Sequence, residues 1–162
     1  LPRPWAAGVS ICGPSNLVTL ARECPPTWRH FVNTTLGNPD TDADLLSSRS
    51  PVNYVQNIIA PLFVIQGAQD PRVPKAEADQ IVERLRARGI EVRYDLYDDE
   101  GHGFTNRDNE IQAYTDIAAF LTHHLQRTGG HWHHHPWPSR LVPCCRESYG
   151  RSRSASRSSL PT

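Results

Sequence analysis

The stretch Pro-Leu-Phe-Val-Ile-Gln-Gly-Ala-Gln-Asp-Pro-Arg-Val-Pro at residues 61–74 places the strongest constraint on the fold. Residues 62–65 form a short apolar run between a proline and a glycine, which is typical of a strand buried on both faces. The chain then becomes polar, and Asp70 precedes a proline that favours an extended backbone before a helix begins at Pro74. The sequence therefore predicts a central strand with Asp70 at its carboxyl end, where open α/β sheets bind ligands.

Two further strands are predicted on either side of this stretch. Residues 6–12 are small and apolar and end in a Gly-Pro turn, which indicates a second buried strand. Residues 91–97 alternate between apolar and polar, which predicts a strand with one exposed face nearer the sheet edge. Helices are expected to start at Leu17, capped by Asn16, and at Pro25, and to cover residues 40–46, 74–88 and 109–125. Strands that alternate with helices predict an α/β fold with a parallel sheet and right-handed crossovers.

Composition limits the classes of protein and partner. A chain of 162 residues fits one domain of ordinary size. It contains no methionine, so we expect it to be part of a longer protein whose N-terminal portion is missing. Net charge is zero, and no apolar run is long enough to cross a bilayer, so no membrane and no nucleic-acid partner is expected. The expected location is cytoplasmic. The four cysteines lack metal-ligand spacing and are interpreted as reduced thiols.

The last part of the chain differs from the rest. Residues 129–162 begin with Gly-Gly, contain four closely spaced histidines and an Arg-Ser run, and show no hydrophobic period. We therefore predict two parts, a folded domain at residues 1–128 and a disordered, low-complexity basic tail that limited proteolysis should remove. The histidines suggest a metal site and the Arg-Ser run an RNA-binding segment, but composition is the simpler interpretation of both, so no metal is expected.

His102 lies between two glycines directly after the predicted strand at residues 91–97. The motif by itself fits a surface histidine in a Gly-rich turn equally well. Asp70 and His102, however, each follow a predicted strand by a few residues, so parallel neighbouring strands would bring both to one sheet edge. A carboxylate there can accept the imidazole N–H and leave the other ring nitrogen to act as a base. The order, acid and then histidine, is that of the α/β-hydrolase triad.

Three motifs carry a resemblance to a known family: Gly-Val-Ser-Ile-Cys-Gly-Pro-Ser-Asn-Leu (8–17), Gly-Ala-Gln-Asp-Pro-Arg-Val-Pro (67–74) and Asp-Glu-Gly-His-Gly-Phe (99–104). Together they make residues 5–126 resemble the catalytic domain of the prolyl oligopeptidase family of serine peptidases, especially its acylaminoacyl-peptidase and dipeptidyl-aminopeptidase-like members. The resemblance implies the C-terminal part of an α/β-hydrolase fold.

The resemblance also implies roles and partners. Asp70 would be the triad acid and His102 the triad base, with a peptide as substrate and no cofactor. The nucleophile serine would lie one helix upstream of residue 8, outside this chain, so the chain alone is expected to be inactive. The missing first part of the catalytic domain and a propeller domain would be its partners in the intact enzyme. Its uncovered sheet edge is expected to make the isolated chain prone to associate with itself as a homo-oligomer.

Two serines in the chain need to be tested against the nucleophile pattern. Ser10 lies in Gly-Val-Ser-Ile-Cys, where Cys12 replaces the second glycine, and it sits inside an apolar run rather than at a strand-to-helix elbow. We interpret it as a strand residue. Ser15 precedes the capping Asn16, and its hydroxyl is better suited to supporting that cap. Neither is expected to be the nucleophile.

Two other functions remain open from the sequence. One is an esterase of the same fold, and the other is a non-catalytic binding or regulatory module that keeps the half-sheet without the chemistry. The sequence preceding residue 1 would discriminate them. A serine elbow after a propeller favours the peptidase, an elbow without a propeller favours the esterase, and no elbow favours the module.

Overall fold

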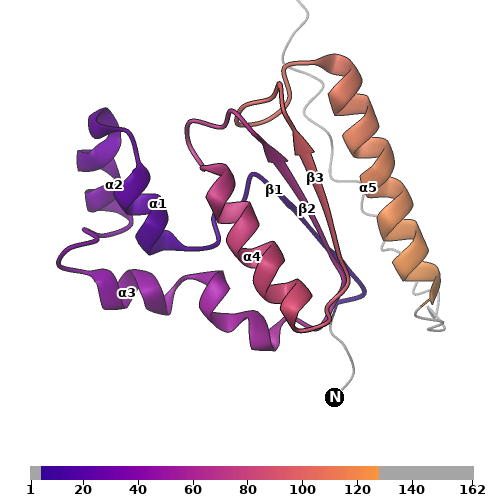
Figure 1. Ribbon diagram of the computed structural model, residues 1–162, viewed down its shortest axis with the longest axis horizontal. Coiled ribbons are helices and arrows are strands. Elements are labelled where there is room, and N and C mark those ends of the chain that lie inside the picture. Colours follow the sequence, from indigo (N-terminus) through magenta and orange to yellow (C-terminus); the bar gives the residue numbers. More distant parts are fainter. Residues whose placement is uncertain (1–4, 128–162) are drawn as a thin grey trace, which may run out of the picture. The chain divides into compact units, whose positions relative to one another are not determined.

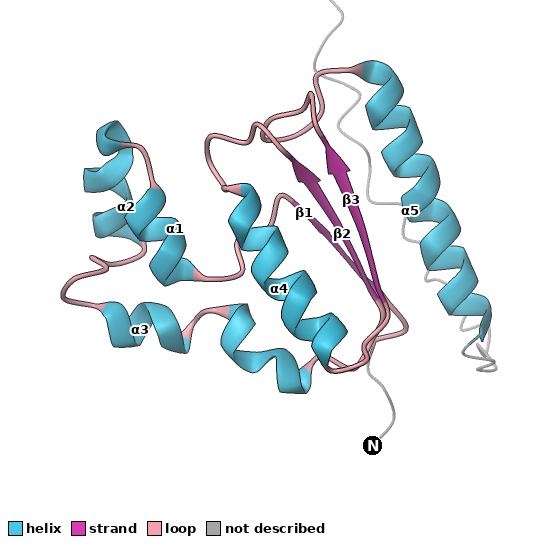
Figure 2. Ribbon diagram, viewed as in Figure 1, coloured by secondary structure: helices cyan, strands magenta, loops and turns pink. Residues whose placement is uncertain are grey.

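Three parallel strands form the centre of the protein in a computed structural model that describes residues 5–127 (Figure 1). They are β1 (Gly8–Ile11), β2 (Leu62–Gly67) and β3 (Val92–Tyr97), and their order in the sheet is β1-β2-β3. The predicted central strand is confirmed, because β2 pairs with both neighbours and residues 63–67 are buried. The arrowheads of β2 and β3 point to the same end of the molecule (Figure 2).

Helices alternate with these strands as predicted, and the fold is α/β. They are α1 (Leu17–Glu23), α2 (Arg29–Thr35), α3 (Ala43–Ser48), α4 (Lys75–Ala87) and α5 (Arg107–Arg127), with 3₁₀ segments η1 (Pro26–Trp28) and η2 (Pro51–Asn57). The Asn16 side chain accepts hydrogen bonds from two amides at the start of α1, which confirms the predicted cap. The last helix begins earlier than predicted because the Asn106 side chain accepts from the Asp108 amide at 2.9 Å.

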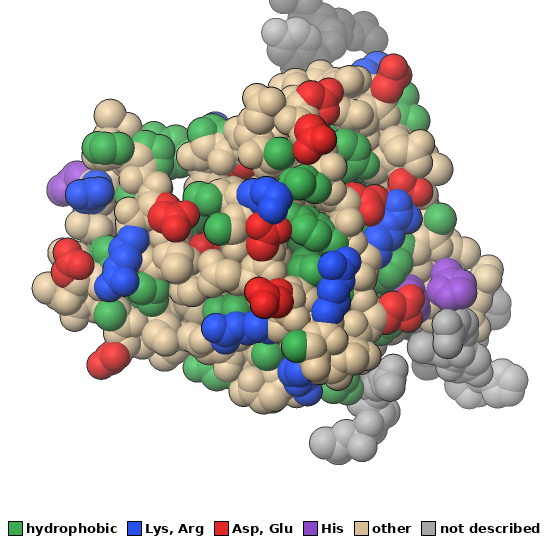
Figure 3. All heavy atoms as spheres, viewed as in Figure 1, with side chains coloured by type: hydrophobic (Ala, Val, Ile, Leu, Met, Phe, Trp, Pro, Cys, Tyr) green, Lys and Arg blue, Asp and Glu red, His purple; other side chains and the backbone are tan. Residues whose placement is uncertain are grey.

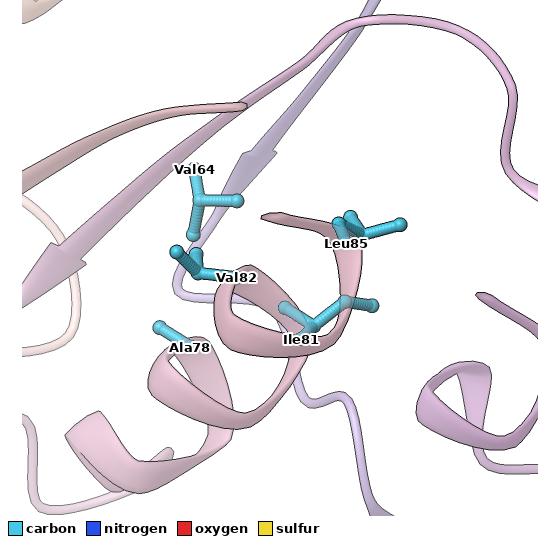
Figure 4. Close-up of a cluster of buried hydrophobic side chains, with 5 residues drawn as sticks. All are labelled: Val64, Ala78, Ile81, Val82 and Leu85. Atoms are coloured by element: carbon cyan, nitrogen blue, oxygen red, sulfur yellow. The ribbon is translucent and has the colours of Figure 1, made fainter. Parts of the chain in front are cut away.

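One face of the sheet packs against α4. Val64 of β2 meets the apolar stripe of this helix, which consists of Ala78, Ile81, Val82 and Leu85 (Figure 4). All five side chains are buried. The spacing of three and four residues that predicted this helix places all four of its core residues on the side that faces β2.

The opposite face of the sheet packs against α5, so the two long helices cover the two faces of the sheet (Figure 1). Phe63 and Ile65 of β2 contact Ala113 and Phe120 of α5. The rings of Phe63 and Phe120 lie 5.5 Å apart in a tilted arrangement. Alternate residues of β2 therefore pack into two separate cores, which explains why residues 62–65 are all apolar.

The prediction that the strand at residues 91–97 has one exposed face is wrong. Every residue of β3 is half-buried, because α5 covers the face that carries Arg93 and Asp95. The Arg93 guanidinium lies 4.5 Å from the centre of the Phe63 ring and pairs with Asp116 of α5 at 2.9 Å. A polar face of a strand can thus be covered when its charge is paired by the helix above it.

The helices between β1 and β2 form a third, smaller cluster around Ala21, Cys24, Val32 and Leu46. Cys12 and Cys24 carry free thiols, as predicted. The described residues contain no helix that combines the length and apolar character needed to cross a membrane. On the face drawn in Figure 3, acidic and basic side chains are interspersed. The predicted tail and its boundary near residue 129 lie outside the described residues.

Candidate active site

Loops that follow the three strands converge at the carboxyl edge of the sheet. Cys12 follows β1, Asp70 lies three residues beyond β2, and His102 lies in the loop after β3. The strands are parallel and in register, with Ile65 of β2 opposite both Ile11 and Asp95, so their last residues lie side by side. This arrangement brings side chains that are far apart in the sequence to one site.

The predicted contact between Asp70 and His102 is confirmed. The Asp70 Oδ2 atom lies 2.8 Å from His102 Nδ1. The Asp70 side chain is fully buried, whereas 35% of the His102 side chain is exposed. Since Nδ1 faces the carboxylate, the other ring nitrogen, Nε2, is the atom left to exchange protons with a substrate or nucleophile.

The second oxygen of Asp70 is held by backbone amides. Oδ1 accepts hydrogen bonds from Arg72 at 2.8 Å and from Val73 at 3.0 Å. Burial by itself would raise the pKa of Asp70, but the amides of Val73 and Arg72 and the contact with His102 outweigh it and lower that pKa below its usual value. Asp70 is therefore a carboxylate at neutral pH.

Gln66 is a residue of this site that the sequence reasoning missed. Its buried side chain reaches along the Asp70 turn, where Nε2 donates to the Val73 carbonyl at 2.9 Å. The same nitrogen lies 3.4 Å from Asp70 Oδ2. The sequence signal that could have identified Gln66 was its polar side chain inside the apolar strand at residues 62–67, because a buried amide needs hydrogen-bond partners near the strand end.

The loop that presents His102 is built from its neighbours. The Gly103 amide donates to the Gly101 carbonyl at 3.1 Å, and Gly103 has a φ of 108°, which side chains disfavour. Glu100 anchors this turn to the start of α5. Its carboxylate accepts from the Thr105 amide at 2.8 Å and from the Asn106 amide at 3.0 Å. The His102 side chain is therefore carried by a turn that hydrogen bonds hold on both sides of the residue.

The carboxylate of Glu100 is strongly stabilised by these contacts. The Thr105 amide and the Asn109 side chain are the main causes that hold the pKa of Glu100 at about 2, well below its ordinary 4.5. The residue itself is buried. Glu100 thus acts as an ionised acceptor that orders the loop rather than as a proton donor.

Cys12 also lies at the site, and the sequence reasoning assigned it no role there. Its Sγ atom, an oxygen of Asp70 and a ring nitrogen of His102 all lie within 4.8 Å of one another. Burial, and to a smaller extent the Asp70 charge, raise the pKa of the Cys12 thiol. Nucleophilic cysteines have a lowered pKa, so Cys12 is not an activated nucleophile. The sequence signal that could have placed Cys12 in this site was its position at the end of the strand predicted at residues 6–12.

The two serines considered above occupy structural positions. Ser10 lies within β1 and pairs with Val64 of β2, as predicted. Ser15 is 2% exposed, and its hydroxyl donates to the Glu77 carbonyl at 2.6 Å.

A groove of about 660 Å³ lies at the other end of the sheet. Its walls include Gly8 and Leu62, the first residues of β1 and β2, together with Trp5 and Tyr54. Asp70 and His102 follow the last residues of their strands, so this groove is not part of the site that they form.

Comparison with solved structures defines the class of fold. An acylaminoacyl peptidase of Pyrococcus horikoshii matches with a TM-score of 0.66 and 24% identity, over 73% of this chain and 20% of that chain. A puromycin hydrolase matches with a TM-score of 0.66 and 21% identity, over 77% of this chain and 19% of the other. The three-stranded sheet and its helices therefore have the fold of an α/β-hydrolase domain.

Sequence comparison then defines the family. Residues 1–128 match the prolyl oligopeptidase family. A dipeptidyl aminopeptidase BIII of Pseudoxanthomonas mexicana is 47% identical over 74% of this chain and 18% of its own length. A dipeptidyl peptidase family member 6 of Caenorhabditis elegans is 40% identical over 74% of this chain and 17% of its own length.

The chain belongs to the prolyl oligopeptidase family, whose members are serine peptidases. The resemblance found from the three motifs is therefore confirmed. The chain spans less than a fifth of the length of these two relatives.

Proposed function

We propose that Asp70 and His102 are the acid and the base of a serine peptidase triad. The observation that carries this proposal is the 2.8 Å contact between Asp70 Oδ2 and His102 Nδ1 at the carboxyl edge of the sheet. A buried carboxylate beside a partly exposed imidazole fits the two roles, because the acid must stay ionised and the base must reach the substrate.

In this mechanism His102 Nε2 takes the proton of a serine hydroxyl as the oxygen attacks the peptide carbonyl. Asp70 fixes the ring tautomer and stabilises the imidazolium that forms. The ring then returns the proton to the leaving amine, and water releases the acyl group in a second round. Backbone amides would stabilise the oxyanion of the tetrahedral intermediate.

The serine in this proposal comes from the part of the catalytic domain that these 162 residues do not contain, and so do the oxyanion amides. The positions of Ser10 inside β1 and of Ser15 against Glu77 support this assignment. Triad members act as a unit, and loss of the serine alone costs on the order of a millionfold in turnover. We therefore propose that the chain by itself is inactive.

Oligopeptides are the proposed substrates. The two relatives above carry the names dipeptidyl aminopeptidase and dipeptidyl peptidase. Six further relatives are acylamino-acid-releasing enzymes that are 23–29% identical over 48–50% of this chain. These names describe release of a dipeptide or of an acylamino acid. In this chain the Arg72 guanidinium lies 5.7 Å from the centre of the Trp28 ring, so η1 borders the loop that carries Asp70.

The test uses the longer polypeptide that carries this chain together with its preceding segment. We expect turnover of dipeptide-releasing substrates and labelling by a serine-directed fluorophosphonate. His102→Ala should abolish both, and Asp70→Asn should lower kcat by about 10⁴-fold because the imidazole loses its correct tautomer.

The isolated 162-residue chain serves as the matched control and should show neither turnover nor labelling. Labelling of Ser10 or Ser15 in that chain, lost on His102→Ala, would mean that the nucleophile lies within it. Full activity of the longer polypeptide with His102→Ala would refute the assignment of the base.

A further inference from the structure

We propose that Cys12, Asp70 and His102 form a binding site for a soft divalent cation such as Zn²⁺ or Cd²⁺. A thiol sulfur, a carboxylate oxygen and an imidazole nitrogen lie within 4.8 Å of one another, each on a different loop at the carboxyl edge of the sheet. These are the donor types that bind zinc in proteins, and three protein ligands with one open position form a recognised arrangement.

The three donors lie within 4.8 Å of one another, so binding of an ion requires donors at that limit to approach by about 1 Å. Zinc binds sulfur at about 2.3 Å and nitrogen or oxygen at about 2.0–2.2 Å, which places tetrahedral donors roughly 3.3–3.8 Å apart. The contact of 2.8 Å between Asp70 Oδ2 and His102 Nδ1 would open by about half an ångström in that geometry. The His102 side chain, which is 35% exposed, provides the path from solvent and room for a water as the fourth ligand.

The backbone of Cys12 and the carboxylate of Asp70 are held in place before any ion arrives, and the Cys12 Sγ atom lies 4.0 Å from the Gly101 carbonyl oxygen. The amide of Cys12 donates to the Ile65 carbonyl at 2.9 Å, and its φ of 49° turns the chain sharply at the end of β1. Asp70 is fixed through Oδ1 by backbone amides, so Oδ2 remains directed at the site. Preorganised ligands lower the entropic cost of binding.

Binding forms a metal–sulfur bond in place of the S–H bond of Cys12 and releases that proton to solvent. The Nδ1 atom of His102 binds the ion through its lone pair, so the ring proton moves from Nδ1 to Nε2 by exchange with solvent, and no electrons are transferred. The ion would occupy the Asp70 carboxylate and a ring nitrogen of His102. Resting on the proposed function, this means that the occupied site cannot support proton transfer, so the cation would act as an inhibitor of the peptidase.

The experiment measures binding of Cd²⁺ to the full 162-residue chain carrying Cys144→Ser and Cys145→Ser. The readout is the ultraviolet absorption of the cadmium–thiolate bond, to which histidines contribute nothing. We expect a band that saturates at one ion per chain. Cys12→Val should remove it, and His102→Gln should weaken the affinity by at least about tenfold, a typical loss when a metal site is disturbed.

Cys24→Ser is the matched control. Cys24 is equally buried, but its thiol donates to the Ala21 carbonyl at 3.2 Å inside the helical cluster, so its replacement should leave the band unchanged. His102→Gln alters a partly exposed side chain and tests the site independently of any packing effect at Cys12. A band that survives Cys12→Val, or an affinity unaffected by His102→Gln, would overturn the proposal. Since the readout is binding, neither outcome depends on whether Asp70 and His102 catalyse.

Discussion

At the scale of single residues, the site depends on how closely two loops approach each other. The amide of Gln69 donates to the Glu100 carbonyl at 3.0 Å, and that of Ala68 donates to the Tyr97 carbonyl at 2.9 Å. These bonds join the turn that carries Asp70 to the loop that carries His102. Gly67 lies where the two loops meet, and the absence of a side chain there allows the approach.

We expect Gly67→Ala to separate Asp70 from His102. A Cβ atom at this position would lie 2.5 Å from the Glu100 carbonyl oxygen and closer still to that of Gly101, so the His102 loop must move. Overpacking against backbone costs about 1–3 kcal/mol of stability. Urea unfolding measures this loss.

Gly8→Ala is the control for that change. Its Cβ would meet only the end of the Leu62 side chain, at 3.2 Å, and the strand gains a better-suited residue. The free energy of unfolding should therefore stay within about 1 kcal/mol of the original. Equal losses in both variants would contradict the close-approach explanation.

Glu100 provides a prediction of pH dependence. Because its folded pKa of about 2 lies below the ordinary 4.5, its contribution to stability is complete above pH 4.5 and is lost as the pH falls from 4.5 towards 2. Glu100→Gln removes the charge at every pH. The variant should thus be less stable than the original chain at pH 6, and the difference should shrink towards pH 2.

Urea unfolding of both chains across this pH range gives the measurement. Asp98→Asn is a suitable control, since Asp98 is an exposed acid in the turn that precedes Glu100. A difference between Glu100→Gln and the original chain that stays constant from pH 6 to pH 2.5 would show that the carboxylate does not stabilise the loop.

At the scale of elements, α4 and the loop after β1 are joined by a buried acid. Glu77 is fully buried in the first turn of α4. Its carboxylate accepts from the Ser15 amide at 3.0 Å and the Asn16 amide at 2.6 Å, and the Thr19 hydroxyl also donates to it. Because α4 follows directly from the Asp70 turn, these bonds connect that turn to the loop that begins at Cys12.

We predict that Glu77→Ala destabilises the chain by about 2–4 kcal/mol, since hydrogen bonds to a charged acceptor are lost and buried donors are left without partners. Glu83→Ala, an exposed position on the same helix, should change stability by less than about 0.5 kcal/mol. Thermal unfolding of the two variants compares them directly. A similar melting temperature for both would show that the Glu77 network does not stabilise the fold.

At the scale of the whole molecule, β1 ends the sheet on one side. In the order β1-β2-β3 its outer hydrogen-bonding groups have no neighbouring strand within residues 5–127. Ile11 of β1 is 38% exposed. An edge of this kind pairs readily with another chain, so we propose that the isolated chain associates with itself through β1.

Ile11→Lys should weaken this association by about tenfold, which corresponds to about 1.4 kcal/mol, because a charge on an edge strand opposes pairing. Ile111→Lys places the same charge on the exposed side of α5 and should leave the association unchanged. Sedimentation equilibrium of the 162-residue chain measures the constant. A chain that is monomeric at all concentrations would disprove association through the edge.

Much of the fold could be predicted from local patterns. The buried run at residues 62–65 and the stripe in α4 depend on the periods of strand and helix, which the sequence displays directly. The motifs around Asp70 and His102 also predicted their contact. Each residue follows a strand, and neighbouring parallel strands bring the residues that follow them to the same edge of the sheet. The half-burial of β3 was not predictable, because the cover on Arg93 comes from Asp116, a partner more than twenty residues away.

The sequence by itself therefore determined the order of strands and helices along the chain, the family and the contact between Asp70 and His102. Only the tertiary structure decided that Cys12 and Gln66 belong to the same site and that Glu77 joins α4 to the loop after β1. The physical reason is that period and turn chemistry are properties of neighbouring residues, whereas a site at a sheet edge is made by strands whose register brings distant residues within a few ångströms.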